Sequence, residues 1–463
     1  MEWTGTRPAI AGSLRAEIPR LLALALPVVF VQVGMMAMGV VDTMVVGRLS
    51  AVDLAAVALG NLYFFSVMVV GWGVLMALDP VVSQAVGAKD DLAISRGLQR
   101  GFVIGGALIL PCILAMLPAQ AVLRLLGQPA DVVPVAARYT WACIPGVPAF
   151  LGFAVLRQTL QAMHRMRPIV WTIIAGNIVN LALNVVLVFG LLGFPRLGAV
   201  GSGCATSISR WFLFLSLAET AWAGLKPYLI PLRPEALAAA PLKRMLRIGL
   251  PIGGQYGLEV GAFAAIALLM GLIGTREIAG HQVAINLASL TFMVPLGVSS
   301  AAAIRVGHAV GRGDPAGARL AARAALFCGA LFMSGTAALF IAAPGPLVWL
   351  YTRDAEVVAL AVALLPIAGF FQVFDGLQVV SIGVLRGLGD TTTPLLVNVL
   401  GFWLLGLPVS LWLAFVHHSG ARGLWWGMVV ALGAVAVFLL LRVRVRLARG
   451  MPRLVVDEAP LSE

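Results

Sequence analysis

Three acidic side chains stand inside apolar stretches of this sequence: Asp42, Glu259 and Asp375. Their surroundings read GMMAMGVVDTMVVG, YGLEVGAFAAIALLM and GFFQVFDGLQVVSIG. An ionised carboxylate at the centre of a bilayer costs roughly 2.5–3.5 kcal/mol on insertion scales, so such a group normally faces a cavity or a partner. Carboxylate oxygens are ligands that hard cations such as Na⁺ prefer, and a buried carboxyl group can instead carry a proton. The sequence therefore predicts cation binding at these positions.

Polar residues elsewhere in the apolar stretches could supply further ligands. Gln282 offers an amide oxygen of the kind that hard cations prefer. Asn180 and Asn184 lie four residues apart and share one face of a helix, where hydrogen bonding between helices would also account for them. Histidine has an ordinary pKa near neutrality, so His281 suits either a proton shuttle or a hydrogen-bonded structural residue.

The elements that position these residues are membrane-spanning helices. Of the 463 residues, 60% are hydrophobic and 11% are charged, whereas a soluble domain has about 25% charged residues. A soluble enzyme is excluded, and an all-α polytopic membrane protein is predicted. Stretches long enough to span ~30 Å of hydrocarbon occur at 18–43, 54–80, 97–119, 134–157, 168–193, 199–222, 245–272, 277–304, 320–343, 356–382, 394–416 and 421–442.

The net charge is +12, and most of the basic residues lie on one side of the membrane in the predicted topology. Twelve spans place 23 lysines and arginines, from Arg7 to Arg453, on one side, and six arginines on the other. This bias predicts that both termini are cytoplasmic. The basic residues are therefore interpreted as topology signals and lipid contacts, and nucleic acid is not an expected partner. The four dispersed cysteines predict neither a disulfide nor a cysteine metal site, and no glycine-rich phosphate loop is present.

The chain contains an internal repeat. A shift of 224 residues places Pro27 on Pro251 and the segment VSQAVGAKD (82–90) on VGHAVGRGD (306–314). The predicted organisation is an N-terminal six-helix lobe (1–222), a cytoplasmic linker (223–243), a C-terminal six-helix lobe (244–445) and a cytoplasmic tail (446–463). Six spans return the chain to its starting side, so the lobes share one orientation about an axis along the membrane normal, with a substrate site between them. The VGxxVGxxD segments are interpreted chiefly as helix-ending loops.

These segments, together with GLPIGGQYGLEVGAFAAIALL, IAGHQVAINLASLTFMVPLGVSS and QVFDGLQVVSIGVLRGLGDT, resemble the multidrug and toxic compound extrusion (MATE) transporters, and the NorM-like bacterial branch in particular. The resemblance covers roughly residues 18–445. It implies two six-helix lobes around a central cavity, from which organic cations are exported in exchange for Na⁺ or H⁺, with no cofactor.

The resemblance also implies roles for individual residues. Asp42 matches the aspartate of the family's first helix, and Asn180 and Asn184 fall on the polar cluster that faces it. Glu259 and Asp375 match the C-lobe carboxylate pair, a candidate Na⁺ site. His281 and Gln282 match the family's AxHQVA segment.

The sequence departs from the family pattern at two positions. Asn184 stands where many relatives have an aspartate, which weakens a proton relay confined to the N-lobe. Phe371 stands where NorM-like relatives can have a tyrosine, so one hydroxyl ligand for Na⁺ is absent. Coupling to Na⁺ and coupling to H⁺ both remain open from the sequence.

The function predicted from these observations is a monomeric antiporter in the bacterial inner membrane that exports amphipathic, often cationic, small molecules. An alternative is a flippase for a lipid-linked precursor, whose cavity would need arginines and lysines for a pyrophosphate. A second alternative, a subunit of a respiratory complex, would need lysines and histidines in mid-membrane. The deepest charges here are acidic, which favours cationic cargo.

Overall fold

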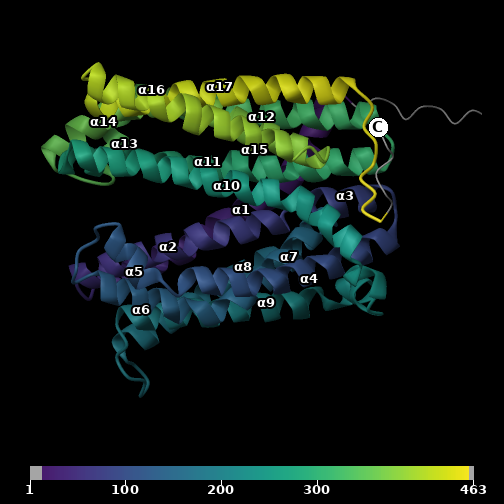
Figure 1. The fold of residues 1–463 in the computed structure, drawn as a ribbon, viewed down its shortest axis with the longest axis horizontal. Helices are drawn as coiled ribbons and strands as arrows, with labels where there is room; N and C mark the ends of the chain where they lie inside the picture. The colour runs from purple at the N-terminus through teal and green to yellow at the C-terminus, as the bar shows by residue number, and fades with distance from the viewer. Residues whose placement is uncertain (1–12, 458–463) are drawn as a thin grey trace, which may run out of the picture.

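The computed structural model describes residues 13–457. Arg7 of the charge-bias prediction and residues 458–463 of the predicted tail lie outside the described residues. Throughout the described part the chain forms helices joined by short connections, in two groups that lie one above the other (Figure 1).

The first group is the N-lobe. Its helices are α1 (Leu14–Val46), α2 (Ala51–Leu75), α3 (Leu78–Gly87), α4 (Asp91–Met116), α5 (Ala119–Leu125), α6 (Val133–Cys143), η1 (Ile144–Gly146), α7 (Val147–Ala162), α8 (Met166–Phe189) and α9 (Ala199–Leu229). A short helix, η2 (Pro234–Leu237), connects this group to the second.

The second group is the C-lobe. Its helices are α10 (Ala239–Ile273), α11 (Thr275–Gly311), α12 (Pro315–Ala342), α13 (Pro344–Trp349), α14 (Ala355–Gly387), α15 (Thr392–Asn398), η3 (Val399–Gly406), α16 (Leu407–Leu411), η4 (Trp412–Val416) and α17 (Gly420–Ala448). The segments η3 and η4 are π-helical.

The all-α fold with twelve spans in two lobes is confirmed. Within residues 13–457, eleven helical segments are long and apolar enough to cross a membrane. The twelfth span is α9, which has 31 residues. Its first half carries Ser202, Thr206, Ser207, Ser209 and Arg210, and these polar side chains lower its mean hydropathy. Several of the helices are longer than the apolar stretches that predicted them, because they continue into the more polar sequence on either side.

In both halves of the repeat, an aspartate side chain caps the start of a helix. Asp90 Oδ1 accepts a hydrogen bond from the backbone N–H of Ala93 at 2.9 Å and caps α4. Asp314 Oδ1 accepts one from Gly317 at 2.8 Å and caps α12. The residue before each aspartate has a positive φ, 57° at Lys89 and 67° at Gly313. These segments therefore end and restart helices, as their sequence indicates.

Their glycines have a second role, since they bring the lobes together. A Cβ at Gly87 would overlap the backbone of His308, and a Cβ at Gly311 would overlap the backbone of Gln84. Residues 84 and 308 are equivalent under the shift of 224, as are 87 and 311. The contact is thus made twice with the roles of the lobes exchanged, which is the signature of a two-fold interface.

A second pair of glycines extends this interface. An ideal Cβ on Gly73 would lie 2.6 Å from Gly253 Cα, and one on Gly297 would lie 3.0 Å from Val29 N. Residues 29 and 253 are again equivalent. We call the surface around these four glycines, Gly73, Gly87, Gly297 and Gly311, the seam. Figure 1 shows the lobes closest together at the end where α3 and the C-terminus lie, and diverging towards α5 and α13. We call these the closed end and the open end.

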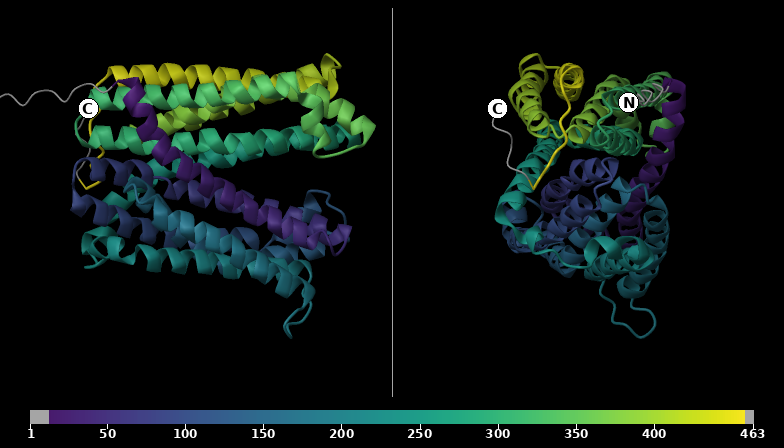
Figure 2. Two further views of the ribbon diagram at one scale, coloured as in Figure 1. Left: turned by 180° about the vertical axis from the view of Figure 1, so that it is seen from behind. Right: turned by 90° about the vertical axis from the view of Figure 1, so that its right-hand side faces the viewer.

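Two further segments cross between the lobes at the closed end. Helix α1 starts beside the C-lobe and runs obliquely to the N-lobe (Figure 2), and Glu17 near its start binds Arg305 of α11 at 2.9 Å. The chain after α17 crosses in the other direction. Arg453 binds Asp90 at 2.7 Å, and the backbone N–H of Leu454 donates to Gln84 Oε1 at 2.6 Å.

Candidate functional site

Asp42 lies in a buried polar cluster of the N-lobe. Its carboxylate is 3% exposed and accepts three hydrogen bonds. Asn184 Nδ2 donates at 2.7 Å, Asn180 Nδ2 at 3.2 Å and the hydroxyl of Thr206 at 2.8 Å. The two asparagines come from one face of α8 and the threonine from α9, so three helices meet at this carboxylate. Arg210, one turn beyond Thr206, lies with its guanidinium 3.7 Å from the ring centroid of Phe64.

Replacing Asp42 by asparagine should destabilise this cluster. An amide keeps the size of the carboxyl group but removes its negative charge, so the three charge-assisted hydrogen bonds around it are weakened. A hydrogen bond to a charged group contributes about 1.5–3 kcal/mol. We expect Asp42→Asn to lower the thermal unfolding temperature of the purified protein in detergent. The same change at the exposed Asp131 is the control, and equal unfolding temperatures for the two variants would contradict the expectation.

Glu259 and Asp375 come together in the C-lobe. Glu259 lies in the middle of α10 and accepts hydrogen bonds from Gln378 Nε2 and Asn398 Nδ2, each at 3.4 Å. Asp375 is three residues before Gln378 on α14 and therefore shares its face. It is 6% exposed, and the hydrogen bond from Gln378 to Glu259 places it near that acid. Two carboxylates and two amides thus lie in one region of the C-lobe, in which Asp375 is buried and Glu259 is partly exposed.

A third amide, Gln282, does not join them. We expected it to supply a ligand to the carboxylates, but its side chain is exposed and donates to Asn286 Oδ1 at 3.1 Å. The reason is that Gln282 and Glu259 lie at different distances from the turn that joins their helices. Helices α10 and α11 meet at Gly274, and at 1.5 Å per residue Glu259 lies roughly 22 Å from that corner along α10, whereas Gln282 lies only about 12 Å along α11.

His281 lies nearer the open end, in an aromatic layer. It is 2% exposed, and its ring contacts Trp425 edge-on with centroids 5.6 Å apart. Trp425 in turn contacts Phe371, which contacts Phe263. Within residues 13–457, His281 Nδ1 has no hydrogen-bond partner. The histidine is therefore separated from the carboxylates and packs against rings.

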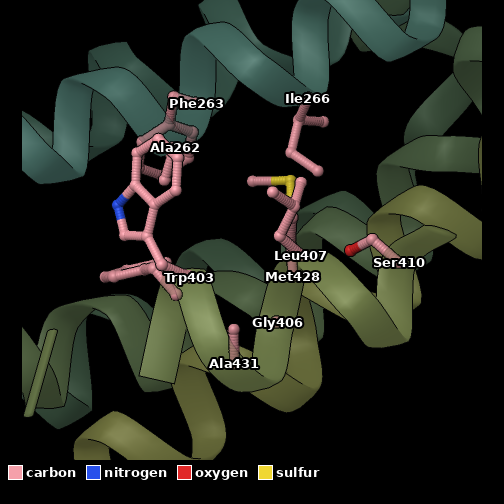
Figure 3. A pocket seen from close by; sticks show the side chains of 10 residues that line it. Ala262, Phe263, Ile266, Trp403, Gly406, Leu407, Ser410, Met428 and Ala431 are labelled. Carbon is pink, nitrogen blue, oxygen red and sulfur yellow. The ribbon is translucent and has the colours of Figure 1, made fainter. Parts of the chain in front are cut away.

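An apolar pocket adjoins the C-lobe carboxylates. It is lined by Phe263 and Ile266 of α10, which follow Glu259 by one and two turns, and by residues of the facing helices (Figure 3). The facing side chains are Phe402, Trp403, Leu407, Ser410, Met428 and Ala431. Trp403 Nε1 donates to the carbonyl of Leu258 at 3.1 Å, which fixes its ring beside α10. Phe263 of this aromatic pocket thus lies one helical turn from the acid Glu259.

The three deep acids differ from the other buried acids in one respect. Glu17, Asp79 and Asp390 each form a salt bridge with an arginine. In the part of the chain that the structure describes, no salt bridge involves Asp42, Glu259 or Asp375. Amides and a hydroxyl donate to Asp42, and amides donate to Glu259. None of the three acids has a cationic side chain of the described residues as its salt-bridge partner.

Several polar residues of these clusters were not predicted from the sequence. Asn398 and Gln378 are single amides within apolar runs, the same signal that identified the acids, and Gln378 also shares a helical face with Asp375. Asn398 further stands where α15 changes into π-helix, a feature frequent at functional sites. Thr206 carried no such signal, because hydroxyl residues are common in spans.

Comparisons with known proteins give one consistent result. The MatE family model matches the chain twice, at residues 27–186 and 251–412. The chain is 37% identical over 430 residues to the multidrug resistance protein NorM of Burkholderia vietnamiensis, covering 90% of this chain and 92% of that protein. It is 35% identical over 438 residues to the multidrug resistance protein MdtK of Edwardsiella ictaluri, covering 92% and 95%. The structure of the eukaryotic MATE transporter AtDTX14 matches with a TM-score of 0.87 at 25% identity, covering 93% and 96%.

Proposed function

Since the chain belongs to the MatE family of multidrug and toxic compound extrusion transporters, we propose that it exports amphipathic, mostly cationic small molecules in exchange for Na⁺ or H⁺. It acts as a monomer in the inner membrane of a bacterium, among lipids, with both termini in the cytoplasm. The closed end then faces the cytoplasm and the open end faces outward. The protein is a transporter and not an enzyme.

The observation that carries this proposal is the unpaired state of the three deep acids. A buried carboxylate without a cationic partner is unfavourable, so Glu259 and Asp375 must bind a proton, a metal cation or a cationic ligand when water is excluded. A site occupied in turn by a coupling ion and by a cationic substrate is what exchange requires. The two carboxylates with Gln378 and Asn398 supply the oxygen donors that Na⁺ prefers, and equally a place for a proton.

The two-fold arrangement supports alternating access between the two sides. A central site between similar lobes becomes accessible from one side when the lobes separate at that end and close at the other. With the glycine seam packed at the closed end, Glu259 and Asp375 are reached from outside, where the coupling cation enters. Its binding displaces the substrate, which leaves through the open end.

The side chains that line the pocket near Glu259 have the chemistry that the proposed substrates need, and α10 and η3 would have to separate to admit one, since the pocket is narrow in this arrangement. Phe263, Phe402 and Trp403 provide flat apolar surfaces for an aromatic body, and Glu259 lies one turn away for the attached positive charge. A cation held near these rings also gains from their negative faces. Binding thus rests on general features, charge and aromatic surface, rather than on a hydrogen-bond pattern that would select one compound.

Transport should depend on an imposed cation gradient. In proteoliposomes with ethidium as substrate, we expect a Na⁺ or a H⁺ gradient, imposed separately, to drive accumulation, because a tenfold difference in the concentration of the exchanged cation is worth about 1.4 kcal/mol. Protein-free liposomes under the same gradients are the control. Ethidium movement at the same rate with neither gradient present would contradict coupling, and no movement under any gradient would contradict drug transport.

A further inference from the structure

A buried ion pair joins the two lobes at the seam. Arg386 Nη1 donates to Asp79 Oδ2 at 3.0 Å. The two side chains are 2% and 3% exposed. Asp79 belongs to α3 of the N-lobe and Arg386 to the last turn of α14 in the C-lobe.

The guanidinium of Arg386 makes contacts with both lobes. Its Nη2 donates to the hydroxyl of Tyr256 at 3.5 Å, and its Nη1 lies 3.6 Å from Met76 Sδ. Tyr256 belongs to α10, one turn before Glu259, and its ring packs against Trp72 of α2 with centroids 5.7 Å apart. The ion pair is thus enclosed by side chains of α2, α3, α10 and α14. It closes the seam directly beneath the region that contains Glu259.

The pair is not part of the two-fold pattern of the seam. The shift of 224 places Asp79 on Ala303, so the second half has no matching acid. The glycines pack the lobes on both sides of the axis, whereas the acid stands on one side only. A second buried arginine, Arg157 of α7, follows Val155-Leu156 as Arg386 follows Val384-Leu385, and it donates to Gln32 Oε1 at 2.7 Å. Packing of the lobes therefore does not by itself require this pair, and a buried ion pair in place of apolar residues seldom adds stability.

Separation of the lobes changes the environment of both charges together. In the packed seam each charge has the other as its partner, away from water. When the seam opens, α3 and α14 move apart, the pair breaks, and water from the new cleft hydrates both groups. Breaking the pair without admitting water would leave two uncompensated buried charges. Intermediate, partly opened arrangements are therefore disfavoured, so that the seam is either fully closed or fully open.

We propose that Asp79 and Arg386 form a latch that holds the closed end shut and must break for the protein to face the cytoplasm. This inference rests on the proposed alternating access. It assigns to the pair a positioning role distinct from the cation binding of Glu259 and Asp375. Loss of either charge should shift the protein towards the state that is open at the closed end, with the opposite change at the open end.

Spin-label distances at both ends test the latch without any substrate. In a background with the four native cysteines replaced by alanine, one label pair at Lys89→Cys and Arg312→Cys reports on the closed end. A second pair at Arg48→Cys and Leu272→Cys reports on the open end. All four positions are exposed. For Arg386→Gln and Asp79→Asn we expect the closed-end distance to lengthen and the open-end distance to shorten by roughly 5 Å or more, the scale of helix rearrangements in switching proteins.

Two matched variants separate a latch from general destabilisation. Arg386→Lys keeps the positive charge and should retain distances near those of the parent. Arg442→Gln removes an arginine from a pair within the C-lobe, with Asp390 at 2.7 Å, and should leave both distances unchanged. Unchanged distances in Arg386→Gln and Asp79→Asn, or a lengthening at both ends, would overturn the latch. Ethidium transport by the parent protein is measured separately, so failure of the latch and failure of the proposed function are distinguishable.

Discussion

Cells that express Glu259→Gln should lose ethidium efflux, and cells that express Asp375→Asn should do so to a similar extent. Both changes keep the shape of the side chain and remove the negative charge that we assign to the coupling cation. An interaction of a charged group with its partner contributes about 1.5–3 kcal/mol, and every 1.4 kcal/mol corresponds to a factor of ten. We therefore expect efflux to fall roughly 10- to 100-fold, measured as the rate of ethidium loss from preloaded cells.

The double variant tests whether the two acids act as one site. If Glu259 and Asp375 hold the same cation, the loss in Glu259→Gln with Asp375→Asn should be far smaller than the product of the two single losses, because coupled residues are not additive. Glu356→Gln is the matched control, since Glu356 is an exposed carboxylate that pairs with Arg276. Wild-type efflux by the double variant, at equal protein levels, would refute the assignment.

The spans and the deep acids were predictable because both depend on local composition. A run of about 20 apolar residues needs no knowledge of its neighbours to be recognised. An acid such as Asp42 within such a run is recognised in the same way. The pairing of Glu259 with Asp375 depends on a fold that brings α10 and α14 together. No local feature of either segment contains that information, and only the family resemblance anticipated it.

The latch pair was missed for a related reason. Asp79 precedes Pro80, a position typical of a helix end, and Arg386 lies beyond the predicted span 356–382 among the basic residues on the cytoplasmic side. Helix α14 in fact continues to Gly387, so Arg386 is buried. The two residues are 307 positions apart in the chain, and only the packing of the lobes shows that they meet.

The glycines of the repeat have two structural roles, ending a helix and allowing close contact between the lobes, and the sequence pattern indicates only the first. The pattern VGxxVGxxD is typical of a helix end, and Gly313 has the positive φ that this requires. Gly87 and Gly311 instead lie within helices, where their lack of a side chain allows close contact with the other lobe. The register between the lobes decides which atoms each glycine faces, and a single segment carries no information on that register.

Filling the seam should stop transport without touching any charged group. Gly87→Leu places a side chain against the backbone of His308, and Gly311→Leu places one against the backbone of Gln84. Backbone cannot move aside as a flexible side chain does, so the lobes are held apart at the closed end. Overpacking typically costs 1–3 kcal/mol, which is comparable to the few kcal/mol that separate conformations of a two-state protein.

Either variant should therefore populate the closed arrangement roughly 5- to 150-fold less, since 1.4 kcal/mol is a factor of ten, and should reduce ethidium efflux accordingly. The two-fold relation demands that both variants behave alike, although they lie in different lobes. Gly106→Leu adds the same side chain to α4 at a position with no atom within 4 Å and should transport normally. Each lobe keeps its own core, so all three proteins should elute as one species in size-exclusion chromatography. Normal efflux by Gly87→Leu or by Gly311→Leu would mean that the seam need not close, and alternating access by separation of these two lobes would then be wrong.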